Sequence, residues 1–261
     1  MLGIAHIKQS MRNNPIGVFD SGVGGLNVLE KCAEILPSEK FIYLADEANM
    51  PYGTKPPNEI RQHALDCACT LFEMNCKAIV VACNTATVNA VNAIREMYPS
   101  RIVIGLEPAV KPCFRELGRL GYAVALVTAA TFGSDKFNRL ICECDGRIKP
   151  VARPELAKLI EDNVNDIKAI APHIYEILAE YKDAEAVILG CSHYTYITDI
   201  ISDFYSGNIK IYDGASGAAQ QLKYCLKVSE LDALCDAKGS MRFYSTYFFE
   251  KNNAENNTKV L

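Results

Sequence analysis

Short apolar runs alternate with longer segments of helical period along most of this chain. The apolar runs are rich in Val, Ile and Ala, and segments of this kind flanked by amphipathic helices are typical of parallel sheets covered on both faces. The pattern therefore predicts an α/β fold. Strands are predicted at Ile16–Asp20, Phe41–Asp46, Ala78–Cys83, Ile102–Glu107, Ala123–Thr128, Ala186–Cys191 and Lys210–Asp213. Helices are predicted at Leu26–Leu36, Asn58–Asn75, Ala86–Tyr98, Asp166–Tyr181 and Thr195–Tyr205.

Two of the predicted strands end alike. Ala-Ile-Val-Val-Ala precedes Cys83 and Ala-Val-Ile-Leu-Gly precedes Cys191, and two hydrogen-bonding residues and a helical pattern follow each cysteine. The two cysteines are 108 residues apart. This weak internal repeat predicts two similar α/β halves, with mostly parallel sheets, that face a shared cleft. We expect a discontinuous first domain of residues 1–106 plus 212–261, frayed at 1–14 and 250–261, and a second domain of residues 107–211.

Polar residues collect where the predicted strands end. In parallel α/β folds ligands bind beyond the carboxyl ends of the strands, so these positions are the candidates for a site. They are Asp20-Ser21-Gly22, Asp46, Cys83-Asn84-Thr85, Glu107-Pro108, Thr128, Cys191-Ser192-His193 and Asp213-Gly214.

Composition excludes some classes of partner. The 261 residues carry a formal net charge of -4, so no strongly basic face for nucleic acid is expected. No apolar run approaches the roughly 18 residues of a membrane-spanning helix. Residues 1–14 lack the long apolar core and cleavage site of a signal peptide. We therefore expect a cytoplasmic chain that binds neither nucleic acid nor a membrane, with Met1 or Met11 as its start.

The cysteines are unusually numerous. There are 11 of them, an odd number, and without an export signal they are expected to be reduced thiols. Neither their spacing nor the four histidines form a zinc pattern, so no metal site is predicted. Most of the cysteines are expected to be small, buried, apolar side chains.

Cys83 and Cys191, taken as a pair, suggest a chemical function. Inverting an amino-acid α-carbon requires one group that removes a proton from one face and another that delivers a proton to the opposite face. A free thiol has a pKa of about 8.5, so one thiol can be ionised while the other is protonated. A helix start after each strand favours the thiolate. Asp20 and His193 are the natural groups to orient the thiols or assist proton transfer.

Each candidate residue also has a purely structural interpretation, and the sequence alone does not decide between the two. A cysteine that closes a buried strand is commonly a packing residue. Asn84, Thr85 and Ser192 are typical helix caps, and His193 is compatible with a surface position or with a structural hydrogen bond. The glycines after Asp20 resemble a phosphate-binding turn, but they follow neither Gly-x-Gly-x-x-Gly nor a P-loop pattern.

Four motifs in one order resemble those of the glutamate racemases in the aspartate/glutamate racemase superfamily. They are Pro-Ile-Gly-Val-Phe-Asp20-Ser-Gly-Val-Gly-Gly, Pro-Tyr52-Gly-Thr, Ala-Cys83-Asn-Thr-Ala-Thr and Gly-Cys191-Ser-His-Tyr, and the likeness runs from about Pro15 to the region of residues 213–226. The resemblance implies two pseudo-symmetric α/β domains with mostly parallel sheets and the active site in the cleft between them. It also implies interconversion of L- and D-glutamate without a cofactor or metal, which supplies D-glutamate for peptidoglycan. Subunits in such families often pair, so a homodimer is a possible state.

The resemblance also implies roles for particular residues. Cys83 would act on the D-enantiomer and Cys191 on the L-enantiomer, assisted by Asp20 and His193 respectively. Glu161 aligns loosely with an acidic residue of the family, and a solvated helix face explains it equally well. The residues that would line the substrate site are Asp20, Ser21, Tyr52, Gly53, Asn84, Thr85, Ser192 and His193.

The chain departs from the family pattern at several positions. Ser192 stands where Thr is usual, Thr195 where Pro is usual, and Ala45-Asp46-Glu47 where Gly-Asp-Thr is common; residues 142–154 match poorly. Three alternatives therefore stay open. They are an aspartate or broad acidic amino-acid racemase, a non-catalytic protein that binds an acidic metabolite, and a cysteine hydrolase that pairs Cys191 with His193.

Overall fold

The computed structural model describes residues 11–233 and 238–247. The chain divides into two compact units, the first made of Met1–Leu106 and Ala215–Leu261 and the second of Glu107–Gly214. The chain thus returns to the first unit after Gly214, whereas the sequence predicts the return after residue 211. The predicted frayed segment 250–261 lies outside the described residues, as do residues 1–10.

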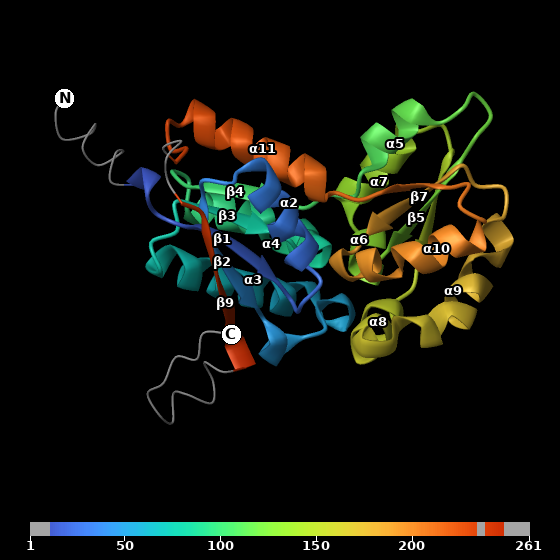
Figure 1. Ribbon diagram of the computed structural model, residues 1–261, viewed down its shortest axis with the longest axis horizontal. Coiled ribbons are helices and arrows are strands. Elements are labelled where there is room, and N and C mark those ends of the chain that lie inside the picture. Colours follow the sequence, from blue (N-terminus) through green and yellow to red (C-terminus); the bar gives the residue numbers. More distant parts are fainter. Residues whose placement is uncertain (1–10, 234–237, 248–261) are drawn as a thin grey trace. The chain divides into compact units, whose positions relative to one another are not determined.

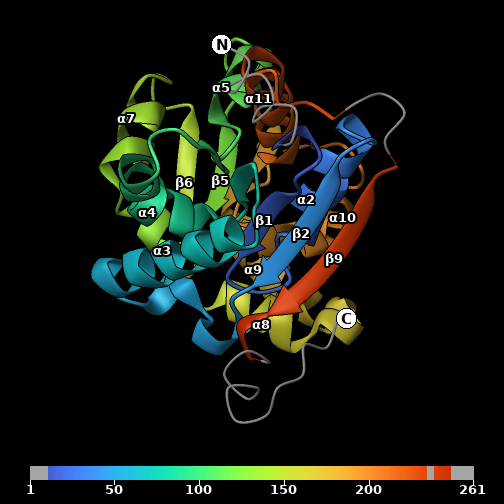
Figure 2. The same cartoon turned by 90° about the vertical axis from the view of Figure 1, so that its left-hand side faces the viewer.

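Unit 1 contains a five-stranded sheet in the order β4-β3-β1-β2-β9, and all of its pairings are parallel. The central strand β1 is buried along its whole length. Figure 2 shows β9 beside β2 at the edge of this sheet. The strands are β1 (Ile16–Asp20), β2 (Lys40–Ala45), β3 (Ala78–Val81), β4 (Ile102–Gly105) and β9 (Ser240–Ser245).

Two pairs of helices cover the faces of this sheet (Figure 1). Helices α2 (Leu26–Ile35) and α11 (Ala215–Val228) pack together over one face, where Val28 and Leu222 are fully buried. Helices α3 (Pro57–Glu73) and α4 (Asn84–Met97) pack over the other face around Leu71. Burial on both sides explains why the strands are continuously apolar instead of alternating.

Unit 2 contains a four-stranded parallel sheet in the order β6-β5-β7-β8. Separate apolar clusters lie on the two sides of this sheet, one with helices α8, α9 and α10 and the other with α5 and α7. The strands are β5 (Ala123–Val127), β6 (Ile148–Ala152), β7 (Ala186–Gly190) and β8 (Lys210–Tyr212). The helices are α5 (Val110–Glu116), α6 (Ala129–Phe132), α7 (Asp135–Cys142), α8 (Leu156–Asp162), α9 (Ala171–Leu178) and α10 (Thr198–Phe204).

The two sheets have the same topology. Unit 1 reads β4-β3-β1-β2 and unit 2 reads β8-β7-β5-β6, so β1 corresponds to β5 and β3 corresponds to β7. Asp20 and Thr128, which end β1 and follow β5, are separated by the same 108 residues as Cys83 and Cys191. Strand β9 has no counterpart among the described residues of unit 2. The predicted fold class of two pseudo-symmetric, mostly parallel α/β domains is confirmed.

All seven predicted strands are present, and those after β1 end one or two residues earlier than predicted. The sequence pattern did not predict β6 and β9, both of which are edge strands. Strand β6 contains Pro150 and an exposed Lys149, and β9 begins with three exposed residues. Edge strands bury less apolar surface, so their sequences carry a weaker strand pattern.

Two predictions require correction. The helix predicted at Asp166–Tyr181 is interrupted, because Asp166 has a non-helical φ of -142° and Pro172 lies in the first turn of the separate helix α9, which begins at Ala171. Part of the N-terminal segment predicted to fray is anchored. The carbonyl oxygen of Arg12 accepts a hydrogen bond of 2.6 Å from Lys77 Nζ, and Arg12 Nε donates to the carbonyl oxygen of Asp232. The buried ammonium of Lys77 requires such acceptors.

Candidate active site

Cys83 follows strand β3 and is the N-cap residue of helix α4. Its Sγ accepts a hydrogen bond of 3.5 Å from the N–H of Ala86, and the residue is 5% exposed. The N–H groups at a helix start carry partial positive charge, so this position stabilises negative charge on the sulfur. The alternative interpretation of Asn84 and Thr85 as the cap is therefore wrong, because Cys83 fills that position and both following residues are helical.

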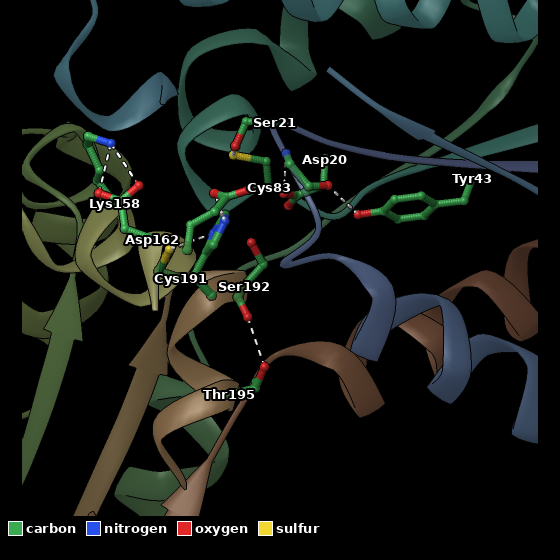
Figure 3. Close-up of polar contacts among 12 residues, drawn as sticks. Asp20, Ser21, Tyr43, Cys83, Lys158, Asp162, Cys191, Ser192 and Thr195 are labelled. Atoms are coloured by element: carbon green, nitrogen blue, oxygen red, sulfur yellow. Dashed lines mark hydrogen bonds and ion pairs between the residues drawn. The ribbon is translucent and has the colours of Figure 1, made fainter. Parts of the chain in front are cut away.

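Ser21 lies next to Cys83 because β1 and β3 are neighbours with parallel register. Its Oγ is 3.7 Å from Cys83 Sγ, and Figure 3 shows the two side chains directed toward one another. Asp20 is fully buried, and its Oδ1 accepts a hydrogen bond of 3.0 Å from the N–H of Gly22. The hydroxyl of Tyr43 donates to the carbonyl of Gly22 at 2.7 Å. Both the N–H and the carbonyl of Gly22 are therefore held by buried side chains, which restrains the turn after β1.

The amide of Asn84 is only partly satisfied. Its Nδ2 donates to the carbonyl of Leu106 at 3.1 Å, whereas its Oδ1 is buried and has no hydrogen-bond partner among the described residues. A buried acceptor without a partner is costly, so this oxygen is ready to receive an N–H donor from a ligand. Thr85 is buried beside it, with 2% of its surface exposed.

Tyr52 has a buried side chain, and its hydroxyl donates to Asp46 Oδ2 at 2.5 Å. Burial raises the pKa of Tyr52 well above its usual value, and the nearby Cys67 and Asp46 raise that pKa further. The phenol is therefore an anchor and keeps its proton. Tyr52 and Gly53 are the first two residues of the short 3₁₀ helix η2 (Tyr52–Thr54), and the backbone N–H of neither donates a hydrogen bond to a described residue. They are the groups that this loop offers to a ligand.

Cys191 follows strand β7 in unit 2, at the position that corresponds to Cys83 after β3. Its Sγ is 3.9 Å from Nδ1 of His193, and Nε2 of the same ring is 2.7 Å from Glu161 Oε2 on α8. The His193 side chain is 5% exposed and that of Glu161 is 15% exposed. His193 is therefore a buried imidazole with a carboxylate partner, and the surface interpretation of this residue is wrong.

The residues after Cys191 form the 3₁₀ helix η5 (Ser192–Ile197). The hydroxyl of Thr195 donates to the carbonyl of Ser192 at 2.9 Å, as Figure 3 shows. At this position, where proline is usual, a side-chain hydrogen bond restrains the turn instead of a fixed φ. Tyr194 is completely buried, and its hydroxyl reaches the carbonyls of Val127 and Arg153 at 3.5 and 3.4 Å, which attaches η5 to the ends of β5 and β6.

Thr128, one of the strand-end candidates, lies beside Thr131, a buried polar residue that the sequence pattern did not indicate. Thr128 follows β5 and caps α6, and its hydroxyl bonds both the N–H and the hydroxyl of Thr131. Both residues are buried. Thr128 is 108 residues from Asp20, so it holds the corresponding place in the internal repeat.

The other described cysteines are mostly packing residues, as predicted. Burial raises the pKa values of Cys32, Cys76 and Cys113 to about 12, and none of the three side chains has exposed surface. No group of three metal-ligating side chains is found among the described residues. Within the same part of the chain, no helix is long and apolar enough to cross a membrane.

Comparison with known proteins identifies the family. The model of the Asp/Glu/Hydantoin racemase family matches residues 16–222. The chain belongs to this family. A glutamate racemase of Clostridium perfringens is 35% identical over 244 residues, which are 92% of this chain and 94% of that protein. The resemblance predicted from the four motifs is thereby confirmed, and the family is one of isomerases.

Solved structures of this racemase family have the same fold. A glutamate racemase isoform of Bacillus anthracis has a TM-score of 0.77 at 27% identity, covering 93% of this chain and 94% of that one. A glutamate racemase of Francisella tularensis, solved in complex with D-glutamate, has a TM-score of 0.74 at 29% identity, covering 90% and 89%. The two-domain racemase fold therefore extends over nearly the whole chain.

Proposed function

We propose that this chain interconverts L- and D-glutamate by a two-thiol mechanism that uses no cofactor. The observation that carries the proposal is the equivalence of two strand ends. Strands β3 and β7 hold the same place in two sheets of the same topology, and each leads into a cysteine with a polar neighbour. Such a pair suits a reaction whose substrate and product are mirror images at one carbon, because each face of that carbon needs its own proton-transfer group.

The proposed proton transfer balances without any other reactant. For L-glutamate, the Cys191 thiolate takes the α-proton and becomes a thiol while the Cys83 thiol gives its proton to the opposite face and becomes a thiolate. D-glutamate reverses both transfers. The enzyme is left in the complementary protonation state, and exchange with solvent restores the starting state.

The two thiols have different assistants in this proposal. At Cys83, the N–H of Ala86 and the hydroxyl of Ser21 stabilise the thiolate, and Asp20 assists proton transfer. At Cys191, His193 accepts or returns the proton through Nδ1, while Glu161 holds the ring through Nε2.

Substrate recognition is assigned to groups whose hydrogen-bonding capacity is unused. The ammonium of glutamate is expected to donate to the buried Oδ1 of Asn84. A carboxylate is expected to accept from the N–H groups of Tyr52 and Gly53. The buried hydroxyls of Thr85 and Ser192 are proposed as further donors, in addition to the contacts that these residues make within the protein. The complex of the Francisella tularensis relative with D-glutamate supports glutamate as the substrate.

The proposal includes a place in the cell. D-glutamate formed in the cytoplasm would enter peptidoglycan synthesis and so support cell wall biogenesis and cell shape. Expression of the chain in a bacterium that requires external D-glutamate should restore growth without it. We also propose a homodimer, and sedimentation of the purified chain should then give twice the mass of one chain.

The deciding experiment is racemisation in heavy water. Each glutamate enantiomer is incubated with the chain, and loss of the α-proton is followed by proton NMR together with optical rotation. The wild-type chain should exchange the α-proton and convert both enantiomers. Cys83→Ser and Cys191→Ser should each lose racemisation by roughly a hundredfold or more, because a serine hydroxyl is a much weaker acid than a thiol. Cys142→Ser, which changes an exposed thiol, is the matched control and should retain full activity.

Other outcomes would favour the alternatives. A binding protein would retain glutamate without exchanging its α-proton. Faster turnover of aspartate than of glutamate would reassign the substrate, and release of ammonia from glutamine would indicate a cysteine hydrolase. Full racemisation by either active-site cysteine variant would refute the two-thiol mechanism.

A further inference from the structure

The end of strand β9 lies beside the loop that carries Tyr52. Strands β2 and β9 are parallel and in register up to Ala45 and Ser245, so the next residues, Asp46 and Thr246, are neighbours although they are 200 positions apart in the sequence. Figure 2 shows β9 running along β2 over its length. Because β9 has no counterpart among the described residues of unit 2, this contact belongs to one half of the repeat.

Thr246 binds the loop through both functions of its hydroxyl. Its Oγ1 donates to Asp46 Oδ1 at 2.8 Å and accepts from the N–H of Ala48 at 3.2 Å. Asn49 Nδ2 donates to the same carboxylate oxygen at 3.0 Å. Asp46 is only 1% exposed, so protein donors and not water determine the orientation of its carboxylate.

The other oxygen of Asp46 holds Tyr52. Oδ2 accepts the short hydrogen bond from the Tyr52 hydroxyl, and the phenol is 1% exposed. The Tyr52 hydroxyl is thereby used within the protein, whereas the N–H groups of Tyr52 and Gly53 are not. A hydrogen-bonded chain therefore runs from Thr246 through the Asp46 carboxylate to the side chain of Tyr52, whose backbone is the part left for a ligand.

We propose that Thr246 is a positioning residue for substrate binding, because it orients Asp46 and thereby holds the Tyr52–Gly53 backbone in place to receive a carboxylate of the substrate. The proposal rests on the proposed function in one respect, namely that these N–H groups bind glutamate. It assigns the C-terminal strand a part in recognition that none of the four sequence motifs contains.

Steady-state kinetics with matched variants test the proposal. Thr246→Val keeps the shape of the side chain and removes its hydroxyl, and it should raise KM for glutamate roughly tenfold while kcat changes by less than about twofold, because a hydrogen bond to a charged group is lost away from the reacting carbon. Thr246→Ser should restore KM. Ser245→Ala is the control, because the neighbouring Ser245 hydroxyl contacts Glu47 and not Asp46, and its KM should equal that of the wild type.

A double-mutant cycle separates positioning from general support of the strand. In a Tyr52→Phe background the chain of hydrogen bonds is already broken, so Thr246→Val should change KM by less than about twofold. Equal effects of Thr246→Val in both backgrounds would overturn the proposal, as would a wild-type KM in the single variant. If Thr246→Val does not fold, Thr246→Ala removes the same hydroxyl with less bulk and replaces it in the cycle.

A spectroscopic measurement keeps this test independent of racemase activity. In protein labelled with ¹³C-tyrosine, the Cζ resonance of Tyr52, assigned by its absence in Tyr52→Phe, should shift in Thr246→Val and stay unchanged in Ser245→Ala. An unshifted resonance in Thr246→Val refutes the positioning role whatever the chain catalyses. Absence of racemisation by the wild type would refute the proposed function alone.

Discussion

His193 lies between a carboxylate and a thiol, with Nε2 2.7 Å from Glu161 Oε2 and Nδ1 3.9 Å from Cys191 Sγ. An Nε2–H that donates to Glu161 leaves Nδ1 with a lone pair that faces the sulfur. In the proposed mechanism, Glu161 thus determines which nitrogen of His193 exchanges a proton with Cys191. The sequence permitted either an active-site or a solvated position for Glu161, and the short contact with a buried imidazole excludes the solvated one.

Glu161→Gln tests this relationship, because glutamine retains the shape of the side chain and loses its charge. Since the two enantiomers have equal free energies, kcat/KM should fall in both directions, by roughly tenfold. The primary isotope effect should rise more for α-deuterated L-glutamate than for the D-enantiomer, because the slowed proton transfer at Cys191 removes the α-proton of L-glutamate, whereas the α-proton of D-glutamate is removed at Cys83. Glu155→Gln is the control, since Glu155 faces the partly exposed His173, and it should have no effect. Equal isotope effects for the two enantiomers would contradict the assignment.

Gly25 is expected to tolerate no side chain, because the structure leaves no room for one. A Cβ at this position would lie 2.7 Å from Asp20 Cβ and 2.8 Å from Ala82 Cβ, and both atoms are attached directly to buried backbone. Gly25→Ala should lower the free energy of unfolding by about 1–3 kcal/mol and reduce racemisation by displacing Asp20. Gly217→Ala is the matched control, because nothing lies within 4 Å of its Cβ position in α11, and it should stabilise the chain by about 0.5–1 kcal/mol. Urea unfolding measures both values, and equal signs would contradict the prediction.

The buried ion pair of Lys77 and Glu39 is expected to stabilise unit 1. Lys77 Nζ lies 2.6 Å from Glu39 Oε2, and both side chains are buried. Lys77→Met should lower the free energy of unfolding by about 3–5 kcal/mol, because the carboxylate of Glu39 is left buried without its cation. Adding Glu39→Gln should recover part of this loss, as measured by urea unfolding. Full stability of Lys77→Met would contradict a role for the pair.

The same lysine gives a pH prediction. Burial lowers the pKa of Lys77 from its ordinary value of 10.5, although Glu39 opposes this effect. In the pH range just below 10.5 the unfolded chain therefore binds more protons at this site than the folded chain, and the contribution of Lys77 to the free energy of unfolding rises with pH. Lys77→Met should lose this rise when unfolding is measured between pH 8 and about pH 10. An identical slope in the variant and the wild type would refute the assignment.

Thiol labelling should separate the packing cysteines from the others. With a pKa of about 12, Cys32, Cys76 and Cys113 are ionised to only about one part in ten thousand at pH 8. Iodoacetamide should therefore modify the exposed Cys142 first and these three last, as mass spectrometry of peptides will show. The rate at the three should rise about tenfold per pH unit in the folded chain. In urea all of these thiols should react alike, and early labelling of Cys32 in the folded chain would contradict the prediction.

Local pattern was enough to predict the fold class, because a strand buried on both faces must be apolar throughout. This held for β1, β3, β5 and β7, which carry the strand-end candidates. The local pattern did not predict the edge strands β6 and β9, which bury little apolar surface. It also predicted one continuous helix over residues 166–181, where the chain is interrupted before α9. The roles of the candidate residues in catalysis and binding stay predictions until the variants are measured.

The order of residues specifies where the chain turns from strand to helix, and therefore which polar residues and thiols lie at the carboxyl ends of strands. The groups that contact these residues are specified by the packing of distant segments. Ser21 meets Cys83 across 62 positions, Glu161 meets His193 across 32, and Thr246 meets Asp46 across 200. Hydrophobic period is a property of neighbours along the chain, whereas these contacts depend on which strands and helices pack side by side, so no local pattern encodes them.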